Sequence, residues 1–338
     1  MSDKKIKDAN ILITGGAGFI GSHLTDRLLD LGHKVVVIDN LSNGRMENLQ
    51  DASPNKRFTF IKGDILKMAD CLKATKNIDI IYHLACLGVR HSLHSPLLNH
   101  RINAEGTLSI LEAAKKNRVP KFFYISSSEI YGSTKSFPID EQALPCPNTV
   151  YGASKLAGEH YTQSYQKCYG LDTTVVRIFN NYGPRAHYEK DSGEIIPRSI
   201  LYILYDKQPI IFGDGSVRRD FFFVKDTALA LSALLKTKNI SGEIFNIGTG
   251  IEITMKKLIK KILALMSKEE LGIQYMEGRP ADVPRLWVNP QKFNQKVKFK
   301  PAYSFEQGLK ETIDYFKEIA KGKNLLSKIV VKNWEIKR

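Results

Sequence analysis

The chain has 338 residues, of which 43% are hydrophobic and 25% charged, a composition typical of a globular protein and not of a disordered one. At about 150 residues per domain, this length predicts two domains. Lys and Arg outnumber Asp and Glu by 50 to 35, so the net charge of +15 favours an anionic substrate. The basic residues are spread along the chain without a compact basic helix, so solvated lysine faces explain the charge better than nucleic-acid binding does.

The cysteines and the apolar runs exclude further classes of protein. The four cysteines show no CxxC or Cys/His spacing, so we expect no metal site and a reducing compartment. No apolar stretch approaches the ~20 residues of a membrane span, and the polar start MSDKKIKDAN is unlike a secretory signal. The sequence therefore predicts a cytoplasmic protein that is not bound to a membrane.

The first two-thirds of the chain alternates short apolar runs with longer amphipathic segments. Strands are expected at residues 11–13, 35–38, 58–61, 78–82, 122–126 and 174–178. Helices are expected at residues 19–31, 66–74, 97–117 and 150–169. Continuous apolar strands separated by helices predict a parallel sheet covered on both faces, which is a doubly wound (Rossmann) α/β fold.

After Asn180 the loops become longer and the strands shorter, which indicates a smaller α/β substrate domain. We assign residues 1–180 to the dinucleotide-binding domain, completed by a helix and strand at about 222–248, and residues 181–221 and 249–325 to the substrate domain. Residues 326–338 form a basic, partly apolar tail. The sequence offers no function for this tail.

The first expected strand runs directly into the glycine-rich turn TGGAGFIG and then into a helix. Gly15 permits the tight turn, Gly18 the approach of a pyrophosphate, and Gly21 close packing of helix on strand. Asp39 ends the second strand, where a carboxylate binds the ribose hydroxyls of NAD and repels the 2′-phosphate of NADP. The alternative for Asp39 is a turn residue, and Arg45 nearby is the one feature that favours NADP.

A tyrosine, a lysine and a serine suggest the chemistry. Tyr151 and Lys155 lie four residues apart on one face of an expected helix, so the ammonium should lower the pKa of the phenol. The phenolate could then take a proton from a sugar hydroxyl while hydride leaves the same carbon for NAD. Ser127 follows the fifth strand, at the sheet edge where ligands bind, and could orient the reacting oxygen. The alternative is that these serines only bond the local backbone.

Taken together, these motifs make residues 9 to 320 resemble the extended short-chain dehydrogenase/reductase family of NAD-dependent sugar-nucleotide epimerases, dehydratases and decarboxylases. The matching motifs, in order, are TGGAGFIG, DNLSNG, GDI at 63–65, HLAC at 83–86, NAEGT at 103–107, SSSEIYG, YGASK, RIFNNYGPR at 177–185 and RRDF at 218–221. The resemblance implies that NAD is the cofactor and that a nucleotide sugar, most often a UDP-sugar, is the substrate.

The resemblance also implies residue roles. Cofactor contacts fall to Gly15, Gly18, Phe19, Ile20, Gly21, Asp39, Asn40, Ser42, Gly44, Asp64, Ile65, Leu84, Ala85, Asn103, Tyr151, Lys155 and Phe179, with Asn103 behind the active site. Substrate contacts fall to Ser128, Asn180, Ile196, Phe212, Arg219, Arg279 and Asp282. The helices at 97–117 and 150–169 resemble the pair that forms the family's homodimer.

The reaction within the family depends on the residues after Ser127. Dehydratases usually carry an aspartate and then a glutamate there, whereas this chain has Ser128 and Glu129, and a serine is a poor general acid. The surrounding YGASKLAGE and DNLSNG motifs favour 4-epimerisation of a UDP-hexose through a 4-keto intermediate, in which Glu129 has no clear role. Glu129 is kept as a catalytic candidate beside Tyr151, Lys155 and Ser127, because it could bond a sugar hydroxyl or act as a base at C5. UDP-glucuronate decarboxylation, 4,6-dehydration and 4-dehydrogenation remain alternatives, and a non-catalytic NAD-binding or nucleic-acid-binding protein is a remote one. The resemblance also implies that Leu286, beside Trp287, occupies the family's position that limits bulk at C2 of the sugar.

Overall fold

The computed structural model describes residues 8–335, and its larger part is a seven-stranded parallel sheet with the strand order β11-β6-β5-β4-β1-β2-β3. The strands are β1 (Asn10–Thr14), β2 (Lys34–Asp39), β3 (Phe58–Lys62), β4 (Ile80–His83), β5 (Lys121–Ser127), β6 (Asp172–Ile178) and β11 (Ile244–Ile247). The order reverses between β1 and β4, which in a doubly wound sheet opens a ligand crevice at the carboxyl ends of these strands. The expected fold is confirmed.

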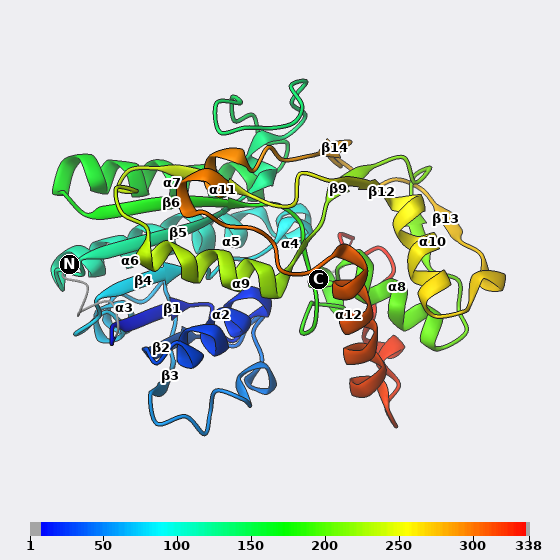
Figure 1. Cartoon of the computed structure of the whole chain (residues 1–338), viewed down its shortest axis with the longest axis horizontal. Coiled ribbons are helices and arrows are strands. Elements are labelled where there is room, and N and C mark those ends of the chain that lie inside the picture. The colour runs from blue at the N-terminus through cyan, green and yellow to red at the C-terminus, as the bar shows by residue number, and fades with distance from the viewer. Residues whose placement is uncertain (1–7, 336–338) are drawn as a thin grey trace.

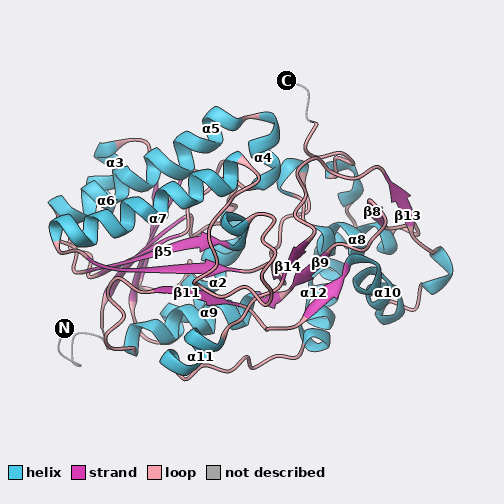
Figure 2. Cartoon of the chain, turned by 90° about the horizontal axis from the view of Figure 1, so that it is seen from above, coloured by secondary structure: helices cyan, strands magenta, loops and turns pink. Residues whose placement is uncertain are grey.

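Helices cover both faces of this sheet (Figure 2). One face carries α3 (Met68–Ala74), α4 (Val89–His94), α5 (Pro96–His100), α6 (Gly106–Lys116) and α7 (Val150–Tyr169). The other carries α2 (Phe19–Asp30), α9 (Val224–Ala233) and α11 (Gln291–Val297). Because side chains alternate along a strand, Ile11 and Ile13 of β1 pack into one apolar core while Leu12, between them, packs into the other.

The observed elements depart from the sequence pattern mainly in one helix. The helix expected at 97–117 is divided into α5, a π-helical turn at Arg101–Glu105 and α6. A π-turn of this kind is often found at functional sites, and this one contains Asn103, which is buried below the cavity described in the next section.

The smaller lobe has its own apolar core and lies beside the carboxyl edge of the large sheet (Figure 1). Its helices are α8 (Ile195–Leu204), α10 (Met255–Leu265) and α12 (Phe305–Ala320). Its short strands form three small sheets: β7 (Asn181–Tyr182) with β10 (Phe222–Phe223), β9 (Arg218–Asp220) with β12 (Glu252–Thr254) and β14 (Arg285–Leu286), and β8 (Ile210–Phe212) with β13 (Gln274–Met276).

Two segments depart from the expected division of the chain. Helix α11 packs on the large domain, since its Phe293 is buried in the same apolar core as the side chains of β11. This part of the expected substrate domain therefore lies with the large sheet. The tail begins with a 3₁₀ turn at Leu325–Lys328 and continues across the smaller lobe to pack Trp334 edge-to-face on Phe212, with ring centroids 4.6 Å apart. Residues 325–335 are therefore part of the folded lobe, and residues 336–338 of the expected tail lie outside the described residues.

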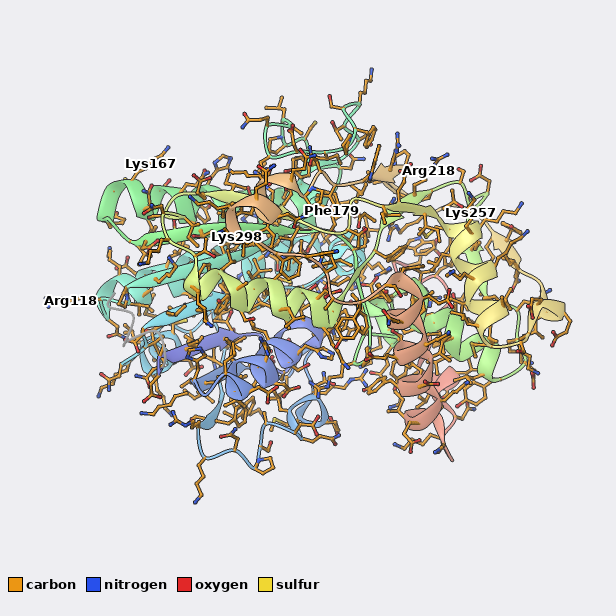
Figure 3. The ribbon with its side chains drawn as sticks, in the orientation of Figure 1. Arg118, Lys167, Phe179, Arg218, Lys257 and Lys298 are labelled. Atoms are coloured by element: carbon orange, nitrogen blue, oxygen red, sulfur yellow. The ribbon has the colours of Figure 1, made fainter. Side chains whose placement is uncertain are left out.

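The positive charge is distributed over the surface. Arg118, Lys167, Arg218, Lys257 and Lys298 are exposed and lie on widely separated elements, whereas Phe179 is buried between the two lobes (Figure 3). None of the helices between residues 8 and 335 combines the length and apolar character needed to cross a membrane.

Candidate active site

A cavity of about 420 Å³ lies along the carboxyl edge of the sheet and is lined by residues of both lobes. All of the predicted catalytic and substrate residues line it, and so do all of the predicted cofactor residues except Asn103. One end is formed by the glycine-rich turn after β1 and the other by β8, β9 and α8 of the smaller lobe. The cavity therefore joins the motifs found in the first half of the chain to residues from the second half.

The glycine turn could hold a pyrophosphate. Gly15 has φ +69°, and a Cβ there would lie 2.8 Å from Ala85 Cα. A Cβ on Gly21 would lie 2.4 Å from the carbonyl oxygen of Gly15, so a side chain at this position would push the helix off the turn. Gly18 is the N-cap of α2 and provides no side-chain cap, which leaves the first N–H groups of the helix and its positive dipole end available to an anion.

Asp39 both supports the turn and faces the cavity. Its Oδ2 accepts a hydrogen bond from Ala17 N at 3.0 Å and its Oδ1 accepts one from Leu41 N at 2.8 Å. Burial raises the pKa of this carboxyl, and the two backbone hydrogen bonds lower it. Since each carboxylate oxygen can accept more than one hydrogen bond, Asp39 can still bind ribose hydroxyls. The two readings of Asp39, turn residue and ribose ligand, are therefore compatible.

Arg45 is directed away from the cavity. Its guanidinium pairs with Glu189 at 2.6 Å and lies 5.1 Å from the ring centroid of Tyr188. It does not belong to the cavity lining, so the one basic group that favoured a 2′-phosphate is engaged elsewhere. This arrangement favours NAD over NADP.

The remaining cofactor candidates are placed by neighbouring strand ends. Phe19, Ile20, Asn40, Ser42, Gly44, Asp64, Ile65, Leu84, Ala85 and Phe179 line the cavity. Asn103 lies behind the wall: it accepts from Leu87 N at 2.8 Å and donates to Ser154 Oγ at 3.1 Å, so it holds the segment after β4 against α7. The uncapped helix, the close approach at Gly15 and Gly21 that a Cβ would block, and the remaining acceptor capacity of Asp39 fit NAD, which would supply a hydride acceptor and donor here.

Helix α7 brings the tyrosine and lysine to the end of β5. Thr149 caps the helix by accepting from Gly152 N at 3.2 Å. Close docking on β5 requires Gly158, where a Cβ would lie 2.2 Å from the hydroxyl of Tyr124. Lys155 Nζ donates to the carbonyl oxygen of Ile125 at 2.6 Å. Tyr151 and Lys155 thereby line the same cavity as Ser127, the last residue of β5.

The charges around Tyr151 differ from the sequence-based expectation. Burial raises the pKa of Tyr151 well above its ordinary value, and a hydrogen bond with Ser127 is the contact that lowers it. Burial also lowers the pKa of Lys155. Lys155 directs its ammonium to a backbone carbonyl, so within the chain alone it is Ser127 that favours the phenolate. Ser127 Oγ also accepts from Glu129 N at 3.2 Å, so this serine bonds the local backbone, and its role in orienting a reacting oxygen stays a prediction.

Ser128 and Glu129 follow Ser127 in a short 3₁₀ turn, Ser128–Tyr131, and both line the cavity. Burial raises the pKa of Glu129, whereas Arg219 and Arg279 lower it. The carboxyl of Glu129 is thus within the electrostatic reach of the arginines expected to bind the diphosphate. Ser128 has no ionisable group at neutral pH, so the position next to Ser127 cannot act as an acid.

The smaller lobe contributes an arginine pair held by one aspartate. Asp282 Oδ1 accepts from Arg219 Nη2 at 2.9 Å and from Arg279 Nη2 at 2.5 Å. Arg219 is buried, and burial lowers its pKa while Asp282 raises it. Together with Asn180, Ile196 and Phe212, these residues line the cavity. Two guanidinium groups side by side can bind a diphosphate through charge-assisted hydrogen bonds.

Several cavity residues were not predicted. Arg90 and Glu194 form a bidentate ion pair across the cavity wall at 3.1 and 3.3 Å. Arg90 lies in α4, the first helix after β4, so the carboxyl end of this strand is the signal that could have drawn attention to it. Arg198, Asn333 and Trp334 also line the cavity, and no motif in the sequence indicates them.

Leu286 does not lie where the sequence comparison suggested. It is fully buried and packs with Ile130, Phe179 and Val288. Leu286 is not among the described residues that line the cavity. The prediction that Leu286 limits bulk at C2 of the sugar is wrong, because its side chain packs in this apolar core.

Comparison with known proteins points to the family that the motifs resemble. The sequence matches the family described as GDP-mannose 4,6 dehydratase over residues 12–312. A putative UDP-glucose 4-epimerase from Methanocaldococcus jannaschii is 35% identical over 314 residues, which cover 91% of this chain and 98% of that protein.

Two solved structures are similar over nearly their whole length. A UDP-N-acetylglucosamine 4-epimerase from Methanobrevibacter ruminantium, in complex with UDP-N-acetylmuramic acid, has a TM-score of 0.87 and 35% identity and covers 93% of this chain and 99% of its own. The dTDP-glucose 4,6-dehydratase DesIV from Streptomyces venezuelae, with NAD bound, has a TM-score of 0.88 and 28% identity and covers 94% of this chain and 99% of its own. The resemblance seen in the motifs is thereby confirmed, and the chain belongs to the extended short-chain dehydrogenase/reductase family of NAD-dependent sugar-nucleotide epimerases and dehydratases.

Proposed function

We propose that the protein is a 4-epimerase of a UDP-hexose that works with tightly held NAD. The observation that carries the proposal is the group formed by Tyr151, Ser127 and Lys155, which shares one cavity with the glycine turn and is followed by a neutral hydroxyl at Ser128. The relatives include proteins named as UDP-sugar 4-epimerases from different organisms, which supports the same reaction.

In this scheme Tyr151 acts as the base and then as the acid. Its phenolate oxygen, which accepts a hydrogen bond from Ser127, takes the proton of the C4 hydroxyl. The single O–H of Ser127 then turns from Tyr151 to the same sugar oxygen. When bound, NAD would supply the hydride acceptor and donor for C4. The sugar turns between the two transfers, so hydride arrives on the other face of C4 and Tyr151 gives the proton back. The net result is an isomer with unchanged mass.

The smaller lobe holds the nucleotide while the sugar turns. Arg219 and Arg279 would bind the diphosphate, and Asp282 keeps their guanidinium groups together. Because the anchoring contacts lie on the diphosphate and not on the hexose, the 4-keto sugar can present either face to the sheet edge. A charge-assisted anchor of this kind contributes about 1.5–3 kcal/mol for each hydrogen bond.

Dehydration is the second candidate, and Glu129 is the observation that favours it. Its carboxyl lies in the cavity, and burial raises its pKa, as a proton-transferring group requires. The acid that would protonate a departing C6 hydroxyl has no counterpart at Ser128. This difference makes epimerisation the better-supported reaction.

A product assay tests the proposal. The protein with NAD is incubated with UDP-glucose, UDP-N-acetylglucosamine and UDP-glucuronate, and the products are resolved by chromatography and mass. An isomer of unchanged mass supports epimerisation. Loss of water or of carbon dioxide would instead assign dehydration or decarboxylation, and loss of two hydrogens would assign a dehydrogenase.

We further propose a homodimer in the cytoplasm. Helices α5 and α7 carry exposed apolar side chains: Leu97 and Leu98 are 82% and 41% exposed, and Tyr169 is 57% exposed. A second copy of the chain would cover an apolar face of this kind. The free thiols of all four cysteines fit a reducing compartment. Analytical ultracentrifugation of the protein and of Leu97→Asp tests the dimer, and a monomeric wild type would rule it out.

A further inference from the structure

The tail that the sequence left without a function is fastened beside the cavity. Arg198 Nη2 donates to the carbonyl oxygen of Val331 at 2.8 Å, and Lys328 pairs with Glu189 at 3.2 Å. On the other side, Lys332 approaches Glu277 at 3.6 Å. The segment thus crosses between the loop before α8 and the loop after β13. It also lies beyond residue 312, where the match to the family ends.

Two tail side chains enter the cavity wall at the end where Ile196 and Phe212 lie. Asn333 and Trp334 both line the cavity, with 0% and 6% of their surface exposed. The Trp334 ring packs edge-to-face on Phe212 at an interplanar angle of 81°. Asn333 Nδ2 donates to the carbonyl oxygen of Gly193 at 3.1 Å, which fixes the orientation of the amide and leaves its Oδ1 as an acceptor.

Three buried polar atoms at this wall lack a hydrogen-bond partner within residues 8–335. They are Trp334 Nε1 and Arg198 Nε, which are donors, and Asn333 Oδ1, which is an acceptor. All three residues line the cavity and are more than nine-tenths buried. Buried polar groups in native proteins are nearly always paired, so a set of three at one place points to a ligand that pairs them.

We propose that Asn333 and Trp334, with Arg198, recognise the base of the nucleotide sugar and select a pyrimidine. The inference rests on the proposed function for the presence of a nucleotide at this site. A pyrimidine such as uracil offers two acceptors and one donor, which match two donors and one acceptor on the protein. Guanine offers one acceptor and two donors on its pairing edge, so it would leave a protein donor and one of its own donors unpaired.

Intrinsic fluorescence tests whether the tail contacts the base. The chain contains two tryptophans, and Trp287 lies outside the cavity with its Nε1 bonded to the carbonyl oxygen of Gly250 at 2.8 Å. In the Trp287→Phe protein, Trp334 is the remaining tryptophan. Titration with UDP, dTDP, CDP, GDP and ADP should give a saturable change in emission with the pyrimidine nucleotides and at least tenfold weaker binding of GDP and ADP. Equal binding of GDP would overturn the selection of a pyrimidine.

Affinity measurements identify the groups responsible. Trp334→Phe keeps the aromatic contact with Phe212 but removes the N–H, so UDP should bind about fivefold more weakly. Asn333→Ala should weaken the binding of UDP by about tenfold. Val331→Ala is the matched control, because its side chain is exposed and its backbone carbonyl is retained. The affinity for NAD should be unchanged in all three variants, whereas loss of NAD binding together with UDP binding would indicate damage to the fold and overturn the assignment.

These measurements separate this inference from the proposed reaction. The tail inference fails and the reaction stands if UDP-sugars are epimerised, UDP does not change the emission of Trp334, and Trp334→Phe binds UDP as tightly as the wild type does. If UDP binds and changes Trp334 emission but no UDP-sugar is isomerised, the inference stands and the reaction fails. If no pyrimidine nucleotide binds, both fail.

Discussion

The two lobes build their parts of the site in different ways. In the large domain, short local motifs place the residues that line the cavity: Gly15 to Gly21 after β1, Asp39 at the end of β2, Ser127 at the end of β5, and the Tyr151–Lys155 pair on α7. In the smaller lobe, Arg198, Arg219, Arg279 and Trp334 come from separate segments brought together only by packing. The candidate catalytic groups are therefore placed by local motifs of the large domain, and the candidate recognition groups by the packing of the smaller lobe.

This contrast predicts different kinetic effects for the two lobes. Changes at the sheet edge should reduce kcat or the affinity for NAD, whereas changes in the smaller lobe should raise KM for the nucleotide sugar and leave kcat nearly unchanged. A sheet-edge variant that changes only KM for the nucleotide sugar, or a variant of the smaller lobe that changes only kcat, would contradict this division.

The largest effect is expected for Tyr151→Phe, which removes the proton-transferring oxygen. We expect kcat to fall by about 10³-fold with KM changed less than threefold, since general acid–base catalysis contributes 10²–10⁴-fold. Steady-state kinetics with the active sugar nucleotide measures it. Tyr275→Phe, at an exposed position outside the cavity lining, is the control. A Tyr151→Phe enzyme with more than a tenth of wild-type kcat would exclude this tyrosine as the base.

Gly21→Val tests the glycine turn. The added Cβ would lie 2.4 Å from the Gly15 carbonyl oxygen, so the turn and the helix must separate. Strain of about 1–3 kcal/mol should weaken the binding of NAD by about 50-fold and lower the melting temperature of the protein. Calorimetry measures both.

Gly170→Asn is the matched control for this substitution. Gly170 ends α7 with a positive φ and open space around its Cα, and asparagine tolerates that conformation. Unchanged affinity for NAD in Gly21→Val would mean that the cofactor does not lie on the turn.

Arg279→Ala tests the smaller lobe. Loss of one charge-assisted hydrogen bond to the diphosphate should raise KM about 20-fold with kcat within threefold of wild type. Arg218→Ala removes an exposed guanidinium that pairs with Glu252 and serves as the control. If kcat falls instead of KM rising, the arginine acts on the reacting carbon and the division of labour between the lobes is incorrect.

The smallest effect is expected for Ser127→Ala, and it is best seen in the pH profile. Burial raises the pKa of Tyr151, so the phenol is protonated at neutral pH and the active phenolate increases about tenfold per pH unit below that pKa. Activity should therefore rise with pH.

Removing Ser127 removes the hydrogen bond that lowers the pKa of Tyr151, so the profile should move to higher pH while kcat at pH 7 falls about tenfold. Ser136→Ala, which changes an exposed serine, is the control. A tenfold loss of kcat with an unshifted profile would show that Ser127 only orients the substrate.

Sequence patterns were sufficient for the large domain because its features are local. The alternation of apolar runs gives the strands, and the strand ends give Gly15, Asp39 and Ser127 directly. The pattern was less reliable where packing overrides it: the helix expected at 97–117 is interrupted by a π-turn, and Leu286 points into the core instead of the cavity.

The sequence by itself determined the Rossmann domain, the glycine turn and the Tyr151–Lys155 pair, because each depends on residues a few positions apart. Only the tertiary structure decided that burial raises the pKa of Tyr151, that Arg45 is held by Glu189, and that the tail reaches the cavity. These properties depend on desolvation and on contacts between segments more than a hundred residues apart, and neither is written in any local pattern.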